Sequence, residues 1–265
     1  MPPPDPQSSS RPGVFTVRTP RVVAARRLHR RRDRDETGRF LAEGPQAVRE
    51  AFRAGVVTEL FATADAAARH PEWSASLVDD AAMEALADTV QPQGLVAVCR
   101  QRDVPLEQAL ARKPRLVAVC VDIRDPGNAG TVLRTADAAG AKTVIFAGDT
   151  VDPYNGKAVR SSAGSLFHVD IVRARDTAAA IATLQAAGLQ VLAADGYGKS
   201  DLFDLSDLHR PTAWLFGSEA HGLPRDLAAD LRVRVPLYGG AESLNLAAAA
   251  AVCLYSSAKA MRSVE

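Results

Sequence analysis

Short apolar runs alternate with segments of helical periodicity along most of the chain. From Arg115 onwards the pattern is most regular, and the apolar runs are continuous rather than alternating. Such runs, separated by helices, are typical of a mostly parallel sheet covered on both faces, so we expect an α/β fold. The expected strands are 116–122, 143–148, 167–172, 190–194, 213–217 and 233–237, and the clearest expected helices are 128–139, 177–187 and 243–260.

A smaller alternating pattern precedes this sheet. A basic segment around Val22 to Leu28 predicts a short helix, and "GRFLAEG", "VTELFAT" and "GLVAVCR" predict strands. "PQAVREAFRAG" and "DDAAMEALAD" predict helices between them, the first with proline at its start and glycine at its end, as helices prefer. The Pro- and Ser-rich start carries no period and predicts a disordered leader. We expect a leader at 1–17, a small α/β domain at 18–107, a linker at 108–115 and the sheet domain at 116–265.

Bulk composition narrows the class of protein only slightly. The chain has 265 residues, 47% of them hydrophobic and 24% charged, and a formal net charge of +1. Nine arginines gather between Arg18 and Arg39, which suggests a basic surface despite the balanced total. Three cysteines are too few and scattered for a disulfide framework or zinc site, and Cys120 and Cys253 lie in apolar runs. No apolar run is long enough to span a bilayer, so we expect a cytoplasmic protein without a membrane partner.

The segment "DPGNAGTVLRTADAAGA" follows the first strand of the larger sheet, where ligands bind in open parallel sheets. Its Gly127 and Gly130 do not have the spacing of a dinucleotide fingerprint, so a nucleotide-dependent oxidoreductase is disfavoured. Asn128 is expected to cap the following helix. Arg134 has a simple alternative explanation, a surface ion pair with Asp137.

Two later segments also follow strands of this sheet. "LFGSEAHGLP" suits the exposure of backbone amides and of one carboxylate, that of Glu219, at the same sheet edge. "VPLYGGAESLNLAAAAAVCLYS" is a glycine-containing loop followed by a helix that is apolar all round. Ser243 or Glu242 is expected to cap that helix, and Asn245 has turn chemistry as its simple explanation.

Together these three segments resemble the sequence motifs of the SpoU/TrmH-like RNA ribose 2′-O-methyltransferases of the SPOUT superfamily. The resemblance comprises N-x-G-x-x-x-R-x-A-x-A-x-G from Asn128 to Gly140, then "FGSE" with Gly222, then the "SLN" loop before an Ala-rich helix. "KAVRSSAGSLFHVDI" and "GRFLAEGPQAVREAF" resemble further parts of the family, the latter in its N-terminal substrate-binding domain of ribosomal-protein-like α/β fold. The similarity covers about residues 20–260.

The resemblance implies a fold, a cofactor and an assembly. It implies a trefoil knot in the C-terminal sheet domain, bound S-adenosylmethionine, no metal, and a homodimer with the active site at the subunit boundary. Arginine stays protonated in proteins, so Arg134 is expected to orient the ribose and stabilise a developing alkoxide rather than act as a base. The implied catalytic positions are Asn128, Arg134, Glu219, Ser243 and Asn245. The implied cofactor positions are Ala194, Gly217, Val235, Leu237 and Leu244. The expected RNA contacts are Arg30, Arg31, Arg32 and Arg160.

The expected substrate is 23S ribosomal RNA, because the two-domain layout resembles that of ribosomal RNA enzymes, some of which confer resistance to ribosome-targeting antibiotics. A transfer RNA 2′-O-methyltransferase is one alternative. A non-catalytic RNA-binding or ribosome-assembly factor is another, although it would not need Asn128 and Arg134.

Overall fold

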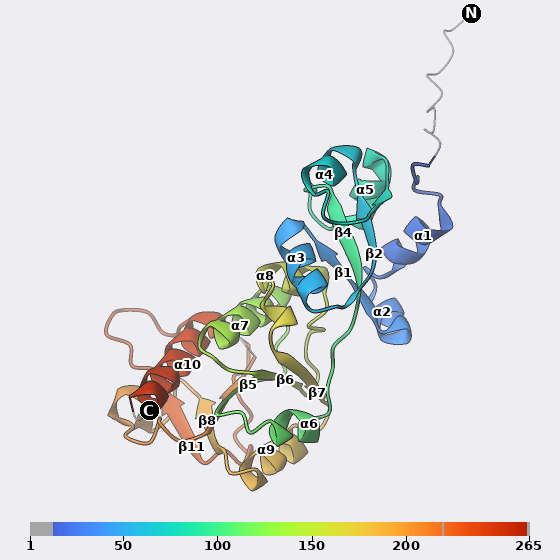
Figure 1. The fold of residues 1–265 in the computed structure, drawn as a ribbon. Coiled ribbons are helices and arrows are strands. Elements are labelled where there is room, and N and C mark those ends of the chain that lie inside the picture. Colours follow the sequence, from blue (N-terminus) through green and yellow to red (C-terminus); the bar gives the residue numbers. More distant parts are fainter. Residues whose placement is uncertain (1–12, 219, 264–265) are drawn as a thin grey trace, which may run out of the picture. The chain divides into compact units, whose positions relative to one another are not determined.

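The computed structural model describes residues 13–218 and 220–263, which form two compact units that divide after Gln101 (Figure 1). The first unit has a small mixed sheet with short helices, and the second has a larger parallel sheet covered by helices on both faces. The expected α/β fold class is therefore confirmed. None of the helices in these ranges is both long and apolar enough to cross a membrane.

The first unit is built on four strands. These are β1 (Arg39–Glu43), β2 (Val57–Ala62), β3 (Ser76–Leu77) and β4 (Leu95–Arg100), in the order β1-β4-β2-β3. The central strand β4 is antiparallel to both of its neighbours, and β3 lies parallel to β2 at the edge. The helices are α1 (Pro20–Arg27), α2 (Arg31–Thr37), α3 (Pro45–Arg53), α4 (Ala64–Arg69) and α5 (Asp80–Leu86).

The second unit is built on seven parallel strands. These are β5 (Leu116–Val121), β6 (Thr143–Ala147), β7 (Asp170–Ala174), β8 (Gln190–Ala194), β9 (Ser200–Asp201), β10 (Thr212–Phe216) and β11 (Leu231–Arg234). The α-helices are α6 (Leu106–Ala111), α7 (Pro126–Ala138), α8 (Gly156–Ser161), α9 (Thr177–Ala186) and α10 (Leu246–Arg262). Two 3₁₀ turns, Ser165–Phe167 and Leu202–Asp204, complete the unit.

The strand order of this sheet is β7-β6-β5-β10-β8-β11-β9. Strand β8 therefore does not pair with β5. The later strand β10 inserts between β5 and β8 and pairs with both. This order places the carboxyl ends of β5, β10, β8 and β11 along one edge, where their loops can meet. The trefoil knot implied by the family resemblance stays a prediction.

Two helical layers enclose the sheet (Figure 1). Helices α7 and α10 pack side by side over β5 and β10, while α6 and α9 lie on the opposite face. The indole of Trp214 on β10 is fully buried, and its Nε1 donates to Ser257 Oγ of α10 over 2.9 Å. Cys120 and Cys253 are buried as expected.

The N-terminal segment differs from the expected leader at 1–17, of which 1–12 lie outside the described residues. Phe15 N donates to Leu77 O over 2.8 Å, and Phe15 and Val17 pack against the core of the first unit. Phe15 and Val17 alternate with Thr16, which matches the period of a strand and explains this pairing. The expected short basic helix is confirmed as α1, whereas the second helix that follows it, α2, was not expected.

The connection between the units also differs from the expected linker at 108–115. Helix α6 occupies the first half of that range, and its Ala109 is buried against the larger sheet. The second unit begins at Arg102, whose N donates to Tyr154 Oη over 2.7 Å, while Tyr154 Oη donates to Asp103 Oδ1 over 3.0 Å. These contacts make the segment an integral part of the second unit rather than a free linker.

Two expected strands are displaced along the chain. The strand expected at 167–172 begins only at Asp170, after the 3₁₀ turn, and the strand expected at 233–237 ends at Arg234. Phe167 and Val169 are buried before β7 without being paired in the sheet, whereas after β11 Val235 is half-buried and Leu237 is exposed. Val235 and Leu237 consequently lie in a loop.

Candidate functional site

A cleft of about 830 Å³ lies at the carboxyl ends of β8, β10 and β11. Its walls are the segments that follow these strands and the loop before α10, and the volume is in the range of about 300–1,000 Å³ usual for small-molecule sites. The structure thus brings together residues that are far apart in the sequence. All five expected cofactor residues line the cleft: Ala194, Gly217, Val235, Leu237 and Leu244.

Gly217 makes one wall of this cleft possible. A Cβ atom at this position would lie 2.3 Å from the carbonyl carbon of Gly222 and 2.6 Å from the backbone nitrogen of Leu223. The chain turns back sharply here, since Gly222 N donates to Ser218 O over 2.8 Å. Gly217 therefore allows a close backbone approach that a side chain at this position would prevent.

The charges that line the cleft are mostly paired. Asp195 accepts from Arg232 over 2.9 Å, and Asp201 lies 3.7 Å from Arg234. These pairs join β11 to the segment after β8 and to β9. Glu242 and Ser243, in the loop before α10, are exposed and also line the cleft.

The N-terminus of α7 lies beside the cleft, and Asp125 rather than Asn128 caps it. Asp125 Oδ1 accepts from Asn128 N over 2.8 Å, so the expectation that Asn128 is the cap is wrong. Pro126 occupies the first helical position, where proline is favoured, and this fixes the start of the helix two residues earlier. Lys157 Nζ donates to Asp125 Oδ2 over 2.9 Å; this contact, followed by the Asn128 amide, lowers the pKa of Asp125.

The two glycines of this turn allow α8 to pack against α7. A Cβ atom on Gly130 would lie 2.3 Å from the backbone oxygen of Ala158 and would also overlap Ser161. A Cβ atom on Gly127 would lie 2.7 Å from Asp125 Oδ1 and 3.1 Å from the stem of Lys157. Helix packing therefore explains the spacing of Gly127 and Gly130, which does not match a dinucleotide fingerprint. The Asn128 side chain lies at the edge of the site.

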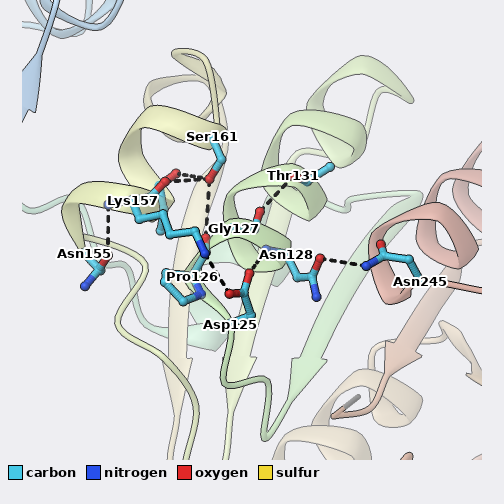
Figure 2. Close-up of polar contacts among 10 residues, drawn as sticks. Asp125, Pro126, Gly127, Asn128, Thr131, Asn155, Lys157, Ser161 and Asn245 are labelled. Atoms are coloured by element: carbon cyan, nitrogen blue, oxygen red, sulfur yellow. Dashed lines mark hydrogen bonds and ion pairs between the residues drawn. The ribbon is translucent and has the colours of Figure 1, made fainter. Parts of the chain in front are cut away.

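Asn128 and Asn245 meet although 117 positions separate them (Figure 2). Asn245 Nδ2 donates to Asn128 Oδ1 over 3.2 Å, while Asn245 Oδ1 accepts from Ala247 N over 2.9 Å. Asn245 therefore caps α10, and the expectation that Ser243 or Glu242 caps this helix is wrong. Because α7 and α10 pack side by side, the first and third sequence motifs share one site next to the cleft.

Arg134 lies six residues after Asn128 on α7, about 9 Å further along the helix axis. Its side chain is exposed, and it forms no ion pair with the residues that the structure describes. Asp137, the partner expected for a surface pair, is instead 2.7 Å from His168 Nδ1. The surface-pair explanation of Arg134 is therefore wrong. Glu219 lies outside the described residues.

The arginines of the first unit divide into structural and exposed groups. Arg34 is buried, and its Nη1 donates to the backbone oxygens of Leu28 and His29 over 2.8 and 2.9 Å. Arg30, Arg31 and Arg32 at the start of α2 are exposed, although Arg31 lies 3.6 Å from Asp35. Arg160 belongs to the second unit, where it is half-buried in α8.

Asp125 and Lys157 are residues of this site that the sequence did not reveal. The sequence does offer one signal for Asp125: proline favours the first position of a helix, so Pro126 points to the residue before it as the cap. Nothing in the sequence indicated that Lys157 would reach it. Within the described ranges, no group of three or more His, Cys, Asp or Glu side chains could hold a metal ion.

Comparison with known proteins agrees with this geometry. Residues 115–255 match the model of the SpoU rRNA methylase family, which spans the cleft and all three motifs. The chain belongs to the SpoU rRNA methylase family. Residues 19–97 match an MRM3-like substrate binding domain, so the SpoU family domain is preceded by a domain described by its role in substrate binding.

Full-length relatives support the membership. The 23S rRNA (guanosine(2553)-2′-O)-methyltransferase RlmP of Bacillus subtilis is 34% identical over 91% of this chain and 97% of its own length. The 23S rRNA (uridine(2479)-2′-O)-methyltransferase of Streptomyces viridochromogenes is 32% identical over 88% of this chain and 86% of its own. The AdoMet-bound rRNA methyltransferase of Sinorhizobium meliloti superposes with a TM-score of 0.81 at 33% identity, covering 93% and 98% of the two chains.

Proposed function

We propose that this protein transfers a methyl group from S-adenosylmethionine to a ribose 2′-hydroxyl of 23S ribosomal RNA. The observation that carries the proposal is the contact between Asn128 and Asn245 beside the cleft. It joins the first and third motifs at one place. Relatives named as 23S rRNA 2′-O-methyltransferases support the substrate.

The residues of the cleft suit S-adenosylmethionine. The segments at Ala194, Gly217 and Val235 line the cleft, and a Cβ at Gly217 would overlap the backbone and disturb its wall. Apolar side chains such as Leu237 and Leu244 line the same space. When bound, the cofactor supplies a methyl group on a sulfonium, which is already a good leaving group.

The chain's own residues would then position and polarise the ribose. The backbone N–H of Asn128 donates to Asp125, and its side-chain oxygen accepts from Asn245. The side-chain amide of Asn128 is therefore held in place at the edge of the cleft. Arg134 supplies a positive charge that stabilises the oxyanion as the 2′-hydroxyl loses its proton to solvent water. Ser243 and Glu219 are proposed to assist from the other two motifs. This charge stabilisation needs no proton removal by arginine.

Calorimetry tests the cofactor assignment directly. Titration with S-adenosylmethionine is expected to release heat with one site per chain, whereas NAD is expected to give none. Addition of 23S rRNA with the labelled cofactor should then place label on the RNA. Heat with NAD alone would restore the oxidoreductase alternative, and cofactor binding without label on ribosomal or transfer RNA would favour an assembly factor.

The choice between ribosomal and transfer RNA rests on the relatives and on the N-terminal domain. The two relatives described above modify a guanosine and a uridine, so the target nucleotide does not follow from the family. Resistance to a ribosome-targeting antibiotic and a cytoplasmic location belong to the proposal as well. Transfer RNA labelled faster than ribosomal RNA would overturn the substrate assignment.

The exposed arginines of α2 are proposed to contact RNA phosphates. Replacing both Arg30 and Arg32 with alanine is expected to weaken RNA binding and to reduce the salt slope by about one unit for each arginine that meets a phosphate. Arg31 is left in place because of its contact with Asp35. The double variant Arg175→Ala/Arg210→Ala, on the second unit, removes the same charge and should keep the wild-type slope. Equal slopes for all three proteins in a salt titration would exclude α2 from the interface.

Homodimer formation is proposed to involve the outer face of α10. Its inner face packs against α7, β5 and β10, but Ala248 is exposed and Tyr255 is 52% exposed on the same outer stripe. Light scattering is expected to give twice the mass of one chain, and Tyr255→Glu to shift the protein toward monomer. A wild-type monomer at micromolar concentration would reject this assembly. The matched variant Tyr197→Glu, at a 96% exposed loop position, should leave the mass unchanged.

A further inference from the structure

Three aromatic rings stack on one side of the first unit. The rings of Phe52 and Trp73 are 5.5 Å apart between centroids and tilted by 9°, and those of His70 and Trp73 are 5.0 Å apart and tilted by 18°. Phe52 belongs to α3, whereas His70 and Trp73 lie in the segment that follows α4. None of the three rings is fully buried, and the His70 side chain is 22% exposed.

The two arginines that adjoin the rings in sequence are paired with carboxylates. Arg53 pairs with Glu50 over 2.7 Å, and Arg69 pairs with Asp65 over 3.0 Å. His70 itself lies 3.3 Å from Glu72. The surface therefore offers partly exposed aromatic rings without a concentration of unpaired positive charge, which fits a nucleobase better than a phosphate.

The stack also borders a cleft of the first unit. His70 and Arg69 line this cleft of about 920 Å³, so the imidazole is accessible from it. Asp80 and Glu84 line the same cleft and are exposed. Their carboxylates would repel phosphate but can accept hydrogen bonds from the N–H groups on the edge of a base.

The geometry points to a base-binding site at which an unpaired nucleobase of the RNA substrate stacks on the Phe52–Trp73–His70 rings. This inference rests on the proposed function, and it adds the feature of RNA that the first unit would recognise: a single-stranded loop or bulge with an unstacked base. Unpaired bases stacked on aromatic side chains are a common mode of sequence-tolerant RNA recognition. The α2 arginines would contribute backbone contacts, and the ring stack would contribute selectivity for unpaired segments.

Tryptophan fluorescence of the full-length wild-type protein tests the site without any substitution. The chain has two tryptophans, and Trp214 is fully buried in the second unit, so a change on RNA binding reports Trp73. A short single-stranded RNA is expected to quench this emission, whereas the same strand annealed to its complement should quench it little. Equal or absent quenching by both probes would overturn the inference.

Variants at His70 provide the second arm. His70→Ala is expected to weaken binding of 23S rRNA by about tenfold or more, as for loss of one base stack, while His70→Tyr retains a ring and should stay near wild type. Cofactor calorimetry should be unchanged in both, since Ala194 and the rest of that cleft belong to the second unit. If wild type methylates RNA and both variants bind and methylate equally well, the stacking site is excluded while the proposed function stands. If wild type itself transfers no methyl group, the proposed function fails, whatever the fluorescence shows.

Discussion

Arg134→Ala is expected to reduce methyl transfer by about a hundredfold or more while the protein remains folded. Loss of a group that stabilises a developing oxyanion costs on the order of 3 kcal/mol in the transition state. The side chain is exposed and has no ion-pair partner within the described residues, and Asp137 is engaged by His168, so the substitution should leave the stability of the fold nearly intact. Single-turnover rates with 23S rRNA, beside calorimetry and thermal unfolding, separate these effects.

Two further variants sharpen this test. Arg134→Lys is expected to fail largely as well, because lysine lacks the planar guanidinium. Arg210→Ala removes an exposed arginine near the opposite end of the same sheet and should keep a rate within about threefold of wild type, less than roughly 1 kcal/mol. A similar small effect for Arg134→Ala would mean that this arginine takes no part in the reaction.

Gly217→Ala is expected to weaken S-adenosylmethionine binding by at least about tenfold. The added Cβ would lie 2.3 Å from a backbone atom of Gly222, and backbone cannot rotate away as a flexible side chain would. Opening this turn costs about 1–3 kcal/mol, and it displaces one wall of the cleft. Calorimetric titration measures the affinity, and thermal unfolding should show a lower midpoint.

Gly240→Ala is the matched control for this position. Gly240 belongs to the loop before α10, and a Cβ atom there would meet nothing within 4 Å. Its cofactor affinity should equal that of wild type. If Gly217→Ala also binds normally, then the turn after β10 does not shape the cofactor site, and the location of that site in the cleft is wrong.

Local sequence chemistry predicted the elements of the larger sheet but not their arrangement. Apolar runs identify strands such as β5 and β10 because buried parallel strands are apolar on both faces. The insertion of β10 between β5 and β8 has no local signature, since it depends on which strand edges remain free. The cleft follows from that order and was therefore implied only by the family resemblance.

Helix starts were predicted less well, for a physical reason. Asp125 and Asn128 are both good caps, as are Ser243 and Asn245, and an isolated sequence does not rank them by propensity alone. In α7 the proline at position 126 makes Asp125 the cap. In α10 the cap is Asn245, whose side chain also contacts Asn128 of a distant segment. The family resemblance named the site residues, but their local roles depend on long-range contacts of this kind, which an isolated sequence does not show.

Mapping the methylated atom on RNA tests the central claim most directly. After incubation of 23S rRNA with the protein and S-adenosylmethionine, partial alkaline hydrolysis should show one protected position, because a 2′-O-methyl group removes the hydroxyl that cleaves the adjacent phosphodiester. That protection should be absent with Arg134→Ala. Label incorporated on a base, with every ribose position still cleaved by alkali, would contradict the proposal that this site methylates the ribose.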